Sequence, residues 1–255
     1  MKYAYNFLLM FLTLAMLSGC STLMKKNDEL IDADFYFERG MEMVKKTDYT
    51  RAVENFQIVV DSFPGSTIVD HAQFMLGQSH YNSEEYITAA YEFERVYKDY
   101  PSSKWAPEAH YHKALCYYME SPSARLDQVN TVMAIGEFNR FKDTYPRNPQ
   151  VEEADKKIEE LVAKLAYKDY LSAELYRKMK NYEAALLYYN YILRDYPRSV
   201  WANYARLGIG EVHFKQEEYE TANTWFQLVF NAEVDDDLRK KAEKRIEDIV
   251  KKSAE

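Results

Sequence analysis

The sequence predicts an all-α protein: a right-handed superhelical solenoid of five helix pairs with a C-terminal capping helix and no sheet. Two observations predict this fold class. Gly and Pro are scarce, seven each among 255 residues, so the chain lacks the turn-formers that many short strands need. In addition, one spacing of small, aromatic and Pro residues recurs along most of the chain, and recurrence at a fixed period is typical of repeat architectures.

The composition excludes several classes of protein. The 23 Tyr and 13 Phe residues are too many for an intrinsically disordered chain. The formal net charge of −8 argues against nucleic acid as the main partner. Two cysteines, Cys20 and Cys116, cannot build a disulfide framework.

The first element is a targeting segment, residues 1–19. A basic start is followed by an apolar run from Phe7 to Leu17, which is shorter than the roughly 20 residues of a membrane-spanning helix. The run ends in Leu-Ser-Gly-Cys, with the Cys at position 20, and this tetrad resembles a bacterial lipobox. The alternative is an ordinary signal peptide that happens to contain a Cys.

The lipobox resemblance implies a lipoprotein. Cleavage would occur before Cys20, and that residue would carry the lipid chains, palmitate among them, as a membrane anchor. Ser21 follows the Cys and favours the outer membrane over the inner membrane. The polar residues 20–30 would form the lipidated Cys and its tether.

A repeat runs through residues 31–234. Each of five units has a small residue, an Ala and an aromatic in order, and four units end in Pro. From Gly40 the intervals to Ala, aromatic and Pro are 12, 16 and 24 residues, and units one and two, like units four and five, are 37 residues apart. The small, Ala and aromatic residues are, unit by unit, Gly40, Ala52 and Phe56; Gly77, Ala89 and Phe93; Ala114, Ala134 and Phe138; Ala173, Ala185 and Tyr189; and Gly210, Ala222 and Phe226. A Tyr stands three residues before the Ala in every unit except the third, which has Thr131.

This pattern resembles the tetratricopeptide repeat (TPR), whose units are pairs of antiparallel helices. Small residues let the two backbones approach, the aromatic fills the space between pairs, and Pro ends the second helix because it lacks an N–H. A single unit cannot bury its apolar faces, so we expect the stack to fold as one solenoid.

Two insertions interrupt the period and set the expected domain layout. Eight extra residues in the third unit contain Ser-Pro-Ser at 121–123 and predict an exposed loop. Fourteen more lie between Pro146 and Ala173, where the stretch from Val151 to Lys180 has no Pro or Gly and predicts one long helix of about 30 residues. The expected segments are TPR repeats 1–3 at 31–148, the long connecting helix that begins repeat 4 at 149–180, the remainder of repeats 4–5 at 181–234, and a charged capping helix at 235–255.

The sequence offers little catalytic chemistry. No pair among the five His residues has the three- or four-residue spacing of a helical metal site, and the Gly residues do not form a phosphate-binding loop. We therefore expect a protein that is not an enzyme and that holds no metal or cofactor.

In the TPR family the first helix of each pair lines a concave groove, which assigns a candidate binding surface. In repeats 1–3 this face would carry five aromatic residues: Phe37, Phe74, Tyr81, Tyr111 and Tyr118. Contiguous exposed apolar side chains mark binding surfaces, and Tyr hydroxyls can bond to a peptide backbone. The alternative is that these rings only pack beneath neighbouring helices.

The lipobox, five TPR units and a long helix dividing three repeats from two together resemble the TPR lipoprotein of the outer-membrane β-barrel assembly machinery, the BamD family. The resemblance implies a non-catalytic scaffold, lipid-anchored at the periplasmic face of the outer membrane, that assists assembly and insertion of β-barrel proteins. Its implied partners are the POTRA domains of the barrel-inserting protein, accessory lipoproteins, and the C-terminal segments of unfolded outer-membrane proteins, with no nucleic acid.

The resemblance also assigns surfaces to these partners. It places substrate and accessory contacts on repeats 1–3 and the POTRA contact on repeats 4–5. Charged residues of the latter are the expected contact set: Glu174, Arg177, Lys178, Arg194, Glu211 and Lys215. The alternative function is that of another TPR lipoprotein, either a pilotin that helps a secretin assemble or a coordinator of envelope division.

Overall fold

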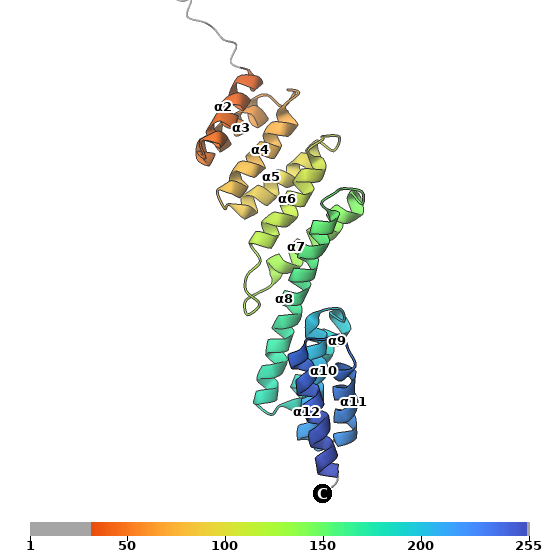
Figure 1. Ribbon diagram of the computed structural model, residues 1–255. Coiled ribbons are helices and arrows are strands. Elements are labelled where there is room, and N and C mark those ends of the chain that lie inside the picture. Colours follow the sequence, from red (N-terminus) through yellow and green to blue (C-terminus); the bar gives the residue numbers. More distant parts are fainter. Residues whose placement is uncertain (1–31, 254–255) are drawn as a thin grey trace, which may run out of the picture. The chain divides into compact units, whose positions relative to one another are not determined.

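The computed structural model describes residues 32–253, and this span consists of helices joined by short turns and one longer loop (Figure 1). Residues 32–253 contain no strand, so the expectation of an all-α helical-repeat fold is confirmed. The helices are α2 (Ala33–Lys45), α3 (Tyr49–Ser62), α4 (Val69–Asn82), α5 (Tyr86–Asp99), α6 (Ala106–Met119), α7 (Val129–Thr144), α8 (Val151–Lys178), α9 (Tyr182–Asp195), α10 (Val200–Lys215), α11 (Tyr219–Phe230) and α12 (Asp236–Ser253).

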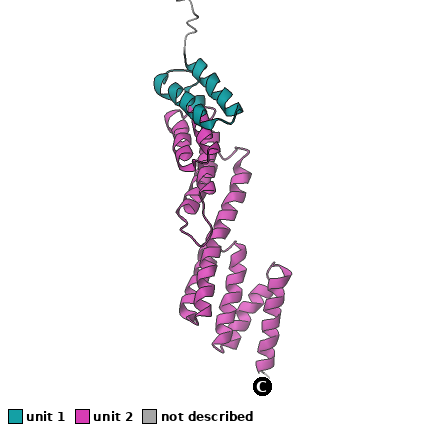
Figure 2. Ribbon diagram, turned by 90° about the vertical axis from the view of Figure 1, so that its left-hand side faces the viewer, with its two compact units in different colours: residues 1–72 teal, residues 73–255 magenta. Residues whose placement is uncertain are grey.

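The helices form two compact units, residues 1–72 and 73–255 (Figure 2). In the first unit α2 packs against α3. The second contains the remaining repeats, and within it α6 packs on α7, α8 on α9, α10 on α11, and α12 on α11. The division falls within α4, so the long helix α8 lies inside the second unit.

The small residues of the repeat lie where an aromatic ring of the paired helix needs room. A Cβ on Gly40 would lie 2.6 Å from the ring of Phe56, and one on Gly210 would lie 2.6 Å from the ring of Phe226. Gly77 faces the ring of Phe93 in the same way, at 2.9 Å. These three aromatic rings have no exposed surface. In the first, second and fifth pairs the two helices are therefore in close contact because one residue has no side chain.

Four of the five pairs share one turn, in which a residue with positive φ follows the first helix. These residues are Thr47, Glu84, Lys180 and Glu217, with φ between 56° and 64°. After each, the next N–H donates back five residues, as Asp48 does to Met43 and Glu218 to His213, both at 2.9 Å. This is the Schellman motif, which satisfies carbonyls at the helix end.

The third pair lacks this turn, because the eight-residue insertion forms a loop there. Gln128 is buried, and its amide nitrogen donates to the carbonyls of Ser123 (2.8 Å) and Leu126 (3.1 Å). Thr131 donates to the amide oxygen of Gln128 at 2.7 Å and lies 2.6 Å from the Ser121 hydroxyl. The buried hydroxyl of Thr131 thus anchors this loop, which explains why the third unit has Thr where the other units have Tyr.

Helix α8 contributes to two hydrophobic cores of the second unit. Its first half places Ala154 and Leu161 among the rings of α6 and α7. Its second half places Ala166 and Ala173 against α9 and α10, where Tyr189 is fully buried. One continuous helix thus ends the packing of the third pair and begins the fourth.

Two lysines on α8 also hold the loop of the third pair in place. Lys164 donates to the Ser121 hydroxyl at 2.8 Å, and Lys168 donates to the Leu126 carbonyl at 2.9 Å. Burial lowers the pKa of Lys164. The loop is therefore attached to the middle of α8.

Candidate functional site

The expected lipidation site, Cys20, lies outside the described residues, as do the targeting segment and the tether. None of the helices within residues 32–253 is long and apolar enough to cross a bilayer. The other cysteine, Cys116, has no exposed surface, and burial raises the pKa of its thiol.

Three of the five groove aromatics are core residues. Phe37, Phe74 and Tyr111 are only 8%, 6% and 6% exposed. The ring of Phe74 stacks on Trp105 at 5.0 Å, and Tyr111 packs against Phe141 at 5.3 Å. Burial raises the pKa of Tyr111 to about 12. These three side chains hold neighbouring helices together and present little surface to a ligand.

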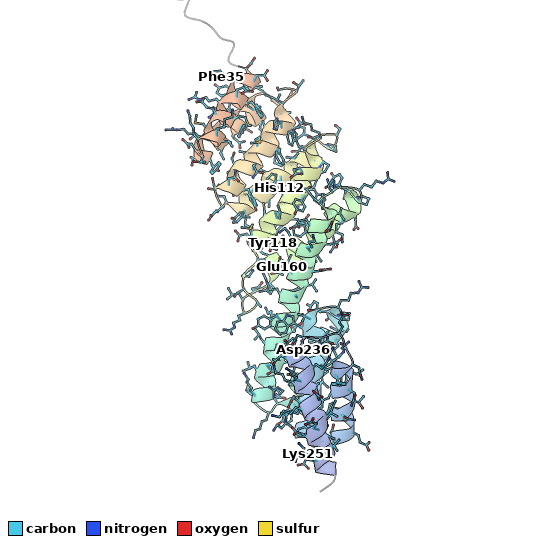
Figure 3. The ribbon with its side chains drawn as sticks, viewed as in Figure 1. Phe35, His112, Tyr118, Glu160, Asp236 and Lys251 are labelled. Atoms are coloured by element: carbon cyan, nitrogen blue, oxygen red, sulfur yellow. The ribbon has the colours of Figure 1, made fainter. Side chains whose placement is uncertain are left out.

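Tyr81 and Tyr118 are half-buried and keep part of their rings accessible. Tyr118 donates its hydroxyl to Glu160 of α8 at 2.7 Å, and this hydrogen bond is the main reason why its pKa rises to about 12 (Figure 3). The ammonium group of Lys157 lies 4.4 Å from the centre of the same ring. Tyr81 makes an edge contact with Tyr86 at 5.2 Å.

Two of the charged residues expected to meet a partner, Glu174 and Arg177, are paired beside a buried tyrosine. Arg177 forms two hydrogen bonds with Glu174, at 2.9 and 2.7 Å, and the hydroxyl of Tyr189 donates to the same carboxylate. Burial favours a higher pKa for Glu174, but the hydrogen bonds from Arg177 and Tyr189 outweigh it and hold this pKa below its usual value. The pair satisfies a buried hydroxyl that would otherwise lack an acceptor.

Tyr189 also explains a glycine that the repeat pattern does not include. A Cβ on Gly208 would lie 2.3 Å from the Tyr189 ring. Because Gly208 and Gly210 are two residues apart, they lie on opposite faces of α10, against α9 and α11 respectively. Helix α10 is thus closely packed on both sides.

The other expected contact residues differ in how freely they face solvent. Arg245 of α12 holds Glu211 through two hydrogen bonds, at 2.6 and 3.0 Å. Arg194 is exposed and pairs with its neighbour Asp195. Lys178 and Lys215 are exposed and form no ion pair within the described part of the chain. These two lysines and Arg194 are the accessible members of the set.

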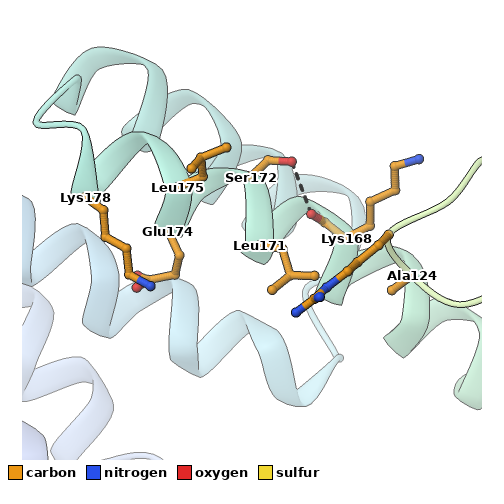
Figure 4. Close-up of a pocket in the computed structure, with 8 residues that line it drawn as sticks. Ala124, Lys168, Leu171, Ser172, Glu174, Leu175 and Lys178 are labelled. Atoms are coloured by element: carbon orange, nitrogen blue, oxygen red, sulfur yellow. Dashed lines mark hydrogen bonds between the residues drawn. The ribbon is translucent and has the colours of Figure 1, made fainter.

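A cleft on the second unit lies between the third-pair loop and α8 (Figure 4). Its volume is about 490 Å³. Its lining residues are Ala124, Arg125, Lys168, Leu171, Ser172, Glu174, Leu175 and Lys178. Sequence spacing places the α8 residues near one face but does not reveal the loop opposite them, so the cleft was not expected.

The described residues offer no metal-binding cluster: within 32–253, no three His, Cys, Asp or Glu side chains gather closely enough to hold an ion. His80 and His213 instead lie 2.6 and 2.5 Å from Glu85 and Glu218, the residues that begin the next helix. These His residues occupy the same position in the second and fifth pairs, where they support the turn.

Comparison with known proteins identifies relatives along most of the chain. Residues 30–227 match the family model YfiO, described as an outer membrane lipoprotein. The chain is 24% identical over 180 residues to the outer membrane protein assembly factor BamD of Rickettsia prowazekii, covering 71% of this chain and 72% of that protein. It is 25% identical over 170 residues to the BamD of Caulobacter vibrioides, covering 66% of this chain and 56% of that one.

A putative BamD of Aquifex aeolicus is 26% identical over 164 residues, 64% of this chain and 54% of the relative. Among solved structures, a tetratricopeptide repeat protein from Parabacteroides merdae aligns at 13% identity, covering 84% of this chain and 98% of that one with a TM-score of 0.39.

Proposed function

The chain belongs to the YfiO family of outer membrane lipoproteins, and on this premise we propose that it is a non-catalytic, outer-membrane-anchored TPR scaffold that assists the assembly of β-barrel outer-membrane proteins. The observation that carries the proposal is the extent of the match. It begins just before α2 and ends within α11, so it includes four complete helix pairs and most of the fifth. The curated relatives are named for the same process, outer membrane protein assembly.

The proposed anchor is the lipidated Cys20, which would hold the protein at the periplasmic face of the outer membrane. Several acyl chains on one residue anchor stably, because each buried CH₂ contributes about 0.8 kcal/mol. A Cys20→Ser variant should move from the membrane fraction to the soluble periplasmic fraction. Retention of this variant at the outer membrane in cells that lack its partners would contradict the lipid anchor.

The proposed partner surface for the POTRA domains lies on repeats 4–5. Its accessible cations are Lys178, Arg194 and Lys215. The other three residues, Glu174, Arg177 and Glu211, form hydrogen bonds within the protein. Exposed interfacial charges mainly tune the rate of association, so reversing two of them together should slow binding more than reversing either alone. Association of Lys178→Glu/Lys215→Glu with purified POTRA domains, followed by biolayer interferometry, measures this effect.

The proposed substrate is the C-terminal segment of an unfolded outer-membrane protein, bound on repeats 2–3 through the accessible rings of Tyr81 and Tyr118. Aromatic side chains at true hot spots contribute about 2 kcal/mol or more. Tyr81→Ala/Tyr118→Ala should therefore weaken binding of a labelled C-terminal peptide more than about tenfold. Phe74→Ala is the matched control, because it removes a buried ring and should lower thermal stability first.

The decisive experiment for the function is a pull-down of the full chain from detergent-solubilised cell envelope. We expect the barrel-inserting protein, together with accessory lipoproteins, to co-purify. Recovery of a secretin, or of division proteins, in place of the barrel-inserting protein would favour the alternative TPR-lipoprotein functions and reject the proposal.

A further inference from the structure

We propose that the cleft between the third-pair loop and α8 binds an extended, acidic and apolar segment of a partner protein. The cleft includes Glu174 and Lys178 of the proposed partner surface. The inference therefore rests on the proposed function in one respect, namely that this surface binds a protein. It adds the chemistry of the segment that is bound.

The first argument is the local charge. The chain as a whole carries −8, yet the cleft is lined by three cations: Arg125, Lys168 and Lys178. Its one carboxylate, Glu174, is held by Arg177 and Tyr189 and adds little free negative charge. A cationic cleft on an acidic protein attracts carboxylates, and its low-dielectric walls strengthen that attraction.

The second argument is the apolar floor between these cations. Leu171 and Leu175 line the cleft, and Leu175 is 57% exposed although it is a large apolar side chain. Figure 4 shows Leu171 and Leu175 along the α8 face, with Ala124 on the loop opposite. Exposed apolar side chains rimmed by polar groups are typical of surfaces that bind proteins.

The third argument is that the loop wall is fixed in place. Ala124 is 8% exposed, and the loop on either side of it is tied by Gln128 and by the two α8 lysines, Lys164 and Lys168. A wall fixed in this way does not have to be ordered when a ligand binds, which lowers the entropic cost of association.

The spacing of the floor residues selects an extended segment. Leu171 and Leu175 are four residues apart on a helix, a rise of about 6 Å. Side chains on one face of an extended strand repeat about every 6.6 Å, so two apolar residues separated by one residue match this pair. Lys168 and Lys178 lie about 15 Å apart along α8, one beyond each end of the leucine pair, where acidic residues flanking the two apolar ones would meet them.

The test uses the full chain purified in detergent and an eight-residue fluorescent peptide with central residues Asp-Leu-Thr-Leu-Glu, capped at both ends. The control peptide carries Asn and Gln in place of the acids. Fluorescence anisotropy should show binding of the acidic peptide that weakens with added salt. The Arg125→Gln/Lys178→Gln variant should weaken binding about fivefold, because exposed ion pairs each contribute modestly.

The variants are chosen so that the fold is preserved. Arg125 and Lys178 are exposed, so thermal unfolding should not change. Leu175→Ser should also weaken binding about fivefold, since it removes an exposed apolar contact. Lys244→Gln/Lys251→Gln is the matched control, because it removes the same two charges from the exposed surface of α12, outside the cleft, and should leave the affinity unchanged.

Three outcomes would overturn the proposal: no binding of the acidic peptide, equal binding of the neutral peptide, or an effect of Lys244→Gln/Lys251→Gln as large as that of the cleft variant. Binding of anionic phospholipid vesicles through Arg125 and Lys178 without peptide binding would assign the cleft to lipid headgroups and also overturn it. Failure of the pull-down with intact peptide binding would reject only the proposed function.

Discussion

At the scale of single residues, the glycines of this protein fall into two groups that sequence spacing does not separate. Gly40, Gly77, Gly208 and Gly210 each lie against an aromatic ring that leaves no room for a Cβ. Gly136 lies in the interior of α7, and a Cβ built on it meets nothing within 4 Å. A helix-interior glycine without a packing role destabilises its helix relative to Ala.

We therefore predict opposite effects of the same substitution at two positions. Gly136→Ala should raise the free energy of unfolding by about 1 kcal/mol, the difference in helix propensity. Gly210→Ala should lower it by about 1–3 kcal/mol, because the buried Phe226 ring cannot move away. Urea unfolding followed by circular dichroism measures both. Equal shifts in the same direction would show that the Phe226 contact does not limit the size of residue 210.

A buried cluster of charges in the second unit makes the free energy of unfolding depend on pH in the acidic range. Glu137 is 5% exposed, and Lys113 lies 3.3 Å from its carboxylate, with Arg140 also paired to it and His110 at 3.7 Å. Burial favours a higher pKa for Glu137, but these three partners outweigh it and hold this pKa below its usual value. A carboxyl whose folded pKa is lowered stabilises the fold above its unfolded pKa and loses that contribution as pH falls through the folded value.

We predict that Glu137→Gln lowers the melting temperature at pH 7 and flattens its fall below about pH 4.5. The neutral Gln amide cannot neutralise the positive charges of Lys113 and Arg140, and it has no carboxyl group that protonates in acid. Thermal unfolding from pH 7 to pH 3 of both proteins checks this. A wild-type and a variant curve that stay parallel over this range would contradict a role of Glu137 in acid sensitivity.

At the scale of elements, the four Schellman turns show what the repeat pattern predicts and what it omits. The spacing of Tyr, Ala and Pro predicts where helices begin and end, since Pro and small residues act locally. The positive φ at Thr47, Glu84, Lys180 and Glu217 has no sequence signal, because glycine, the residue that usually occupies such a position, is absent from all four.

We predict that Glu217→Gly stabilises the protein by about 0.5–1 kcal/mol. The left-handed conformation is strained by about 1–2 kcal/mol for a residue with a Cβ, and the greater freedom of Gly in the unfolded chain offsets part of that gain. Glu247→Gly, inside α12, is the matched control and should destabilise by about 1 kcal/mol. Destabilisation by both changes would show that the turn at 217 is not strained.

At the scale of the whole molecule, the all-α repeat fold followed from the sequence, whereas the accessibility of individual side chains did not. The small and aromatic residues of the repeat could be assigned to helix contacts from the sequence, because they recur with the period of the helix pairs. The surroundings of Glu174 and Phe74 could not be predicted in this way. Glu174 is held by Arg177 and Tyr189, and Phe74 stacks on Trp105, so the environment of each depends on tertiary contacts. The cleft depends on a loop resting on α8, a contact between residues more than 40 positions apart.

The last helix provides a further test at this scale, because it covers the end of the repeat stack. Leu238, Ala242 and Ile249 of α12 pack with Phe226 and Val229 of α11 in one core, and these side chains are at most 7% exposed. The outward side of α12 carries exposed charges, such as the pair of Lys241 with Asp237 at 2.7 Å. Terminal units of a repeat stack need such a polar outer face to stay soluble.

We predict that deletion of residues 233–255 lowers the melting temperature and makes the protein aggregate. The deletion exposes the apolar face of α11, which then binds other copies, and it removes Arg245, the partner of Glu211. Deletion of residues 251–255 alone is the control, since it leaves Ile249 in place and should behave as the full chain does. Size-exclusion chromatography and dye binding to exposed apolar surface measure the difference. If both deletions left the protein monomeric and equally stable, α12 would not act as the cap of the stack, and the core around Phe226 would have to be stable without it.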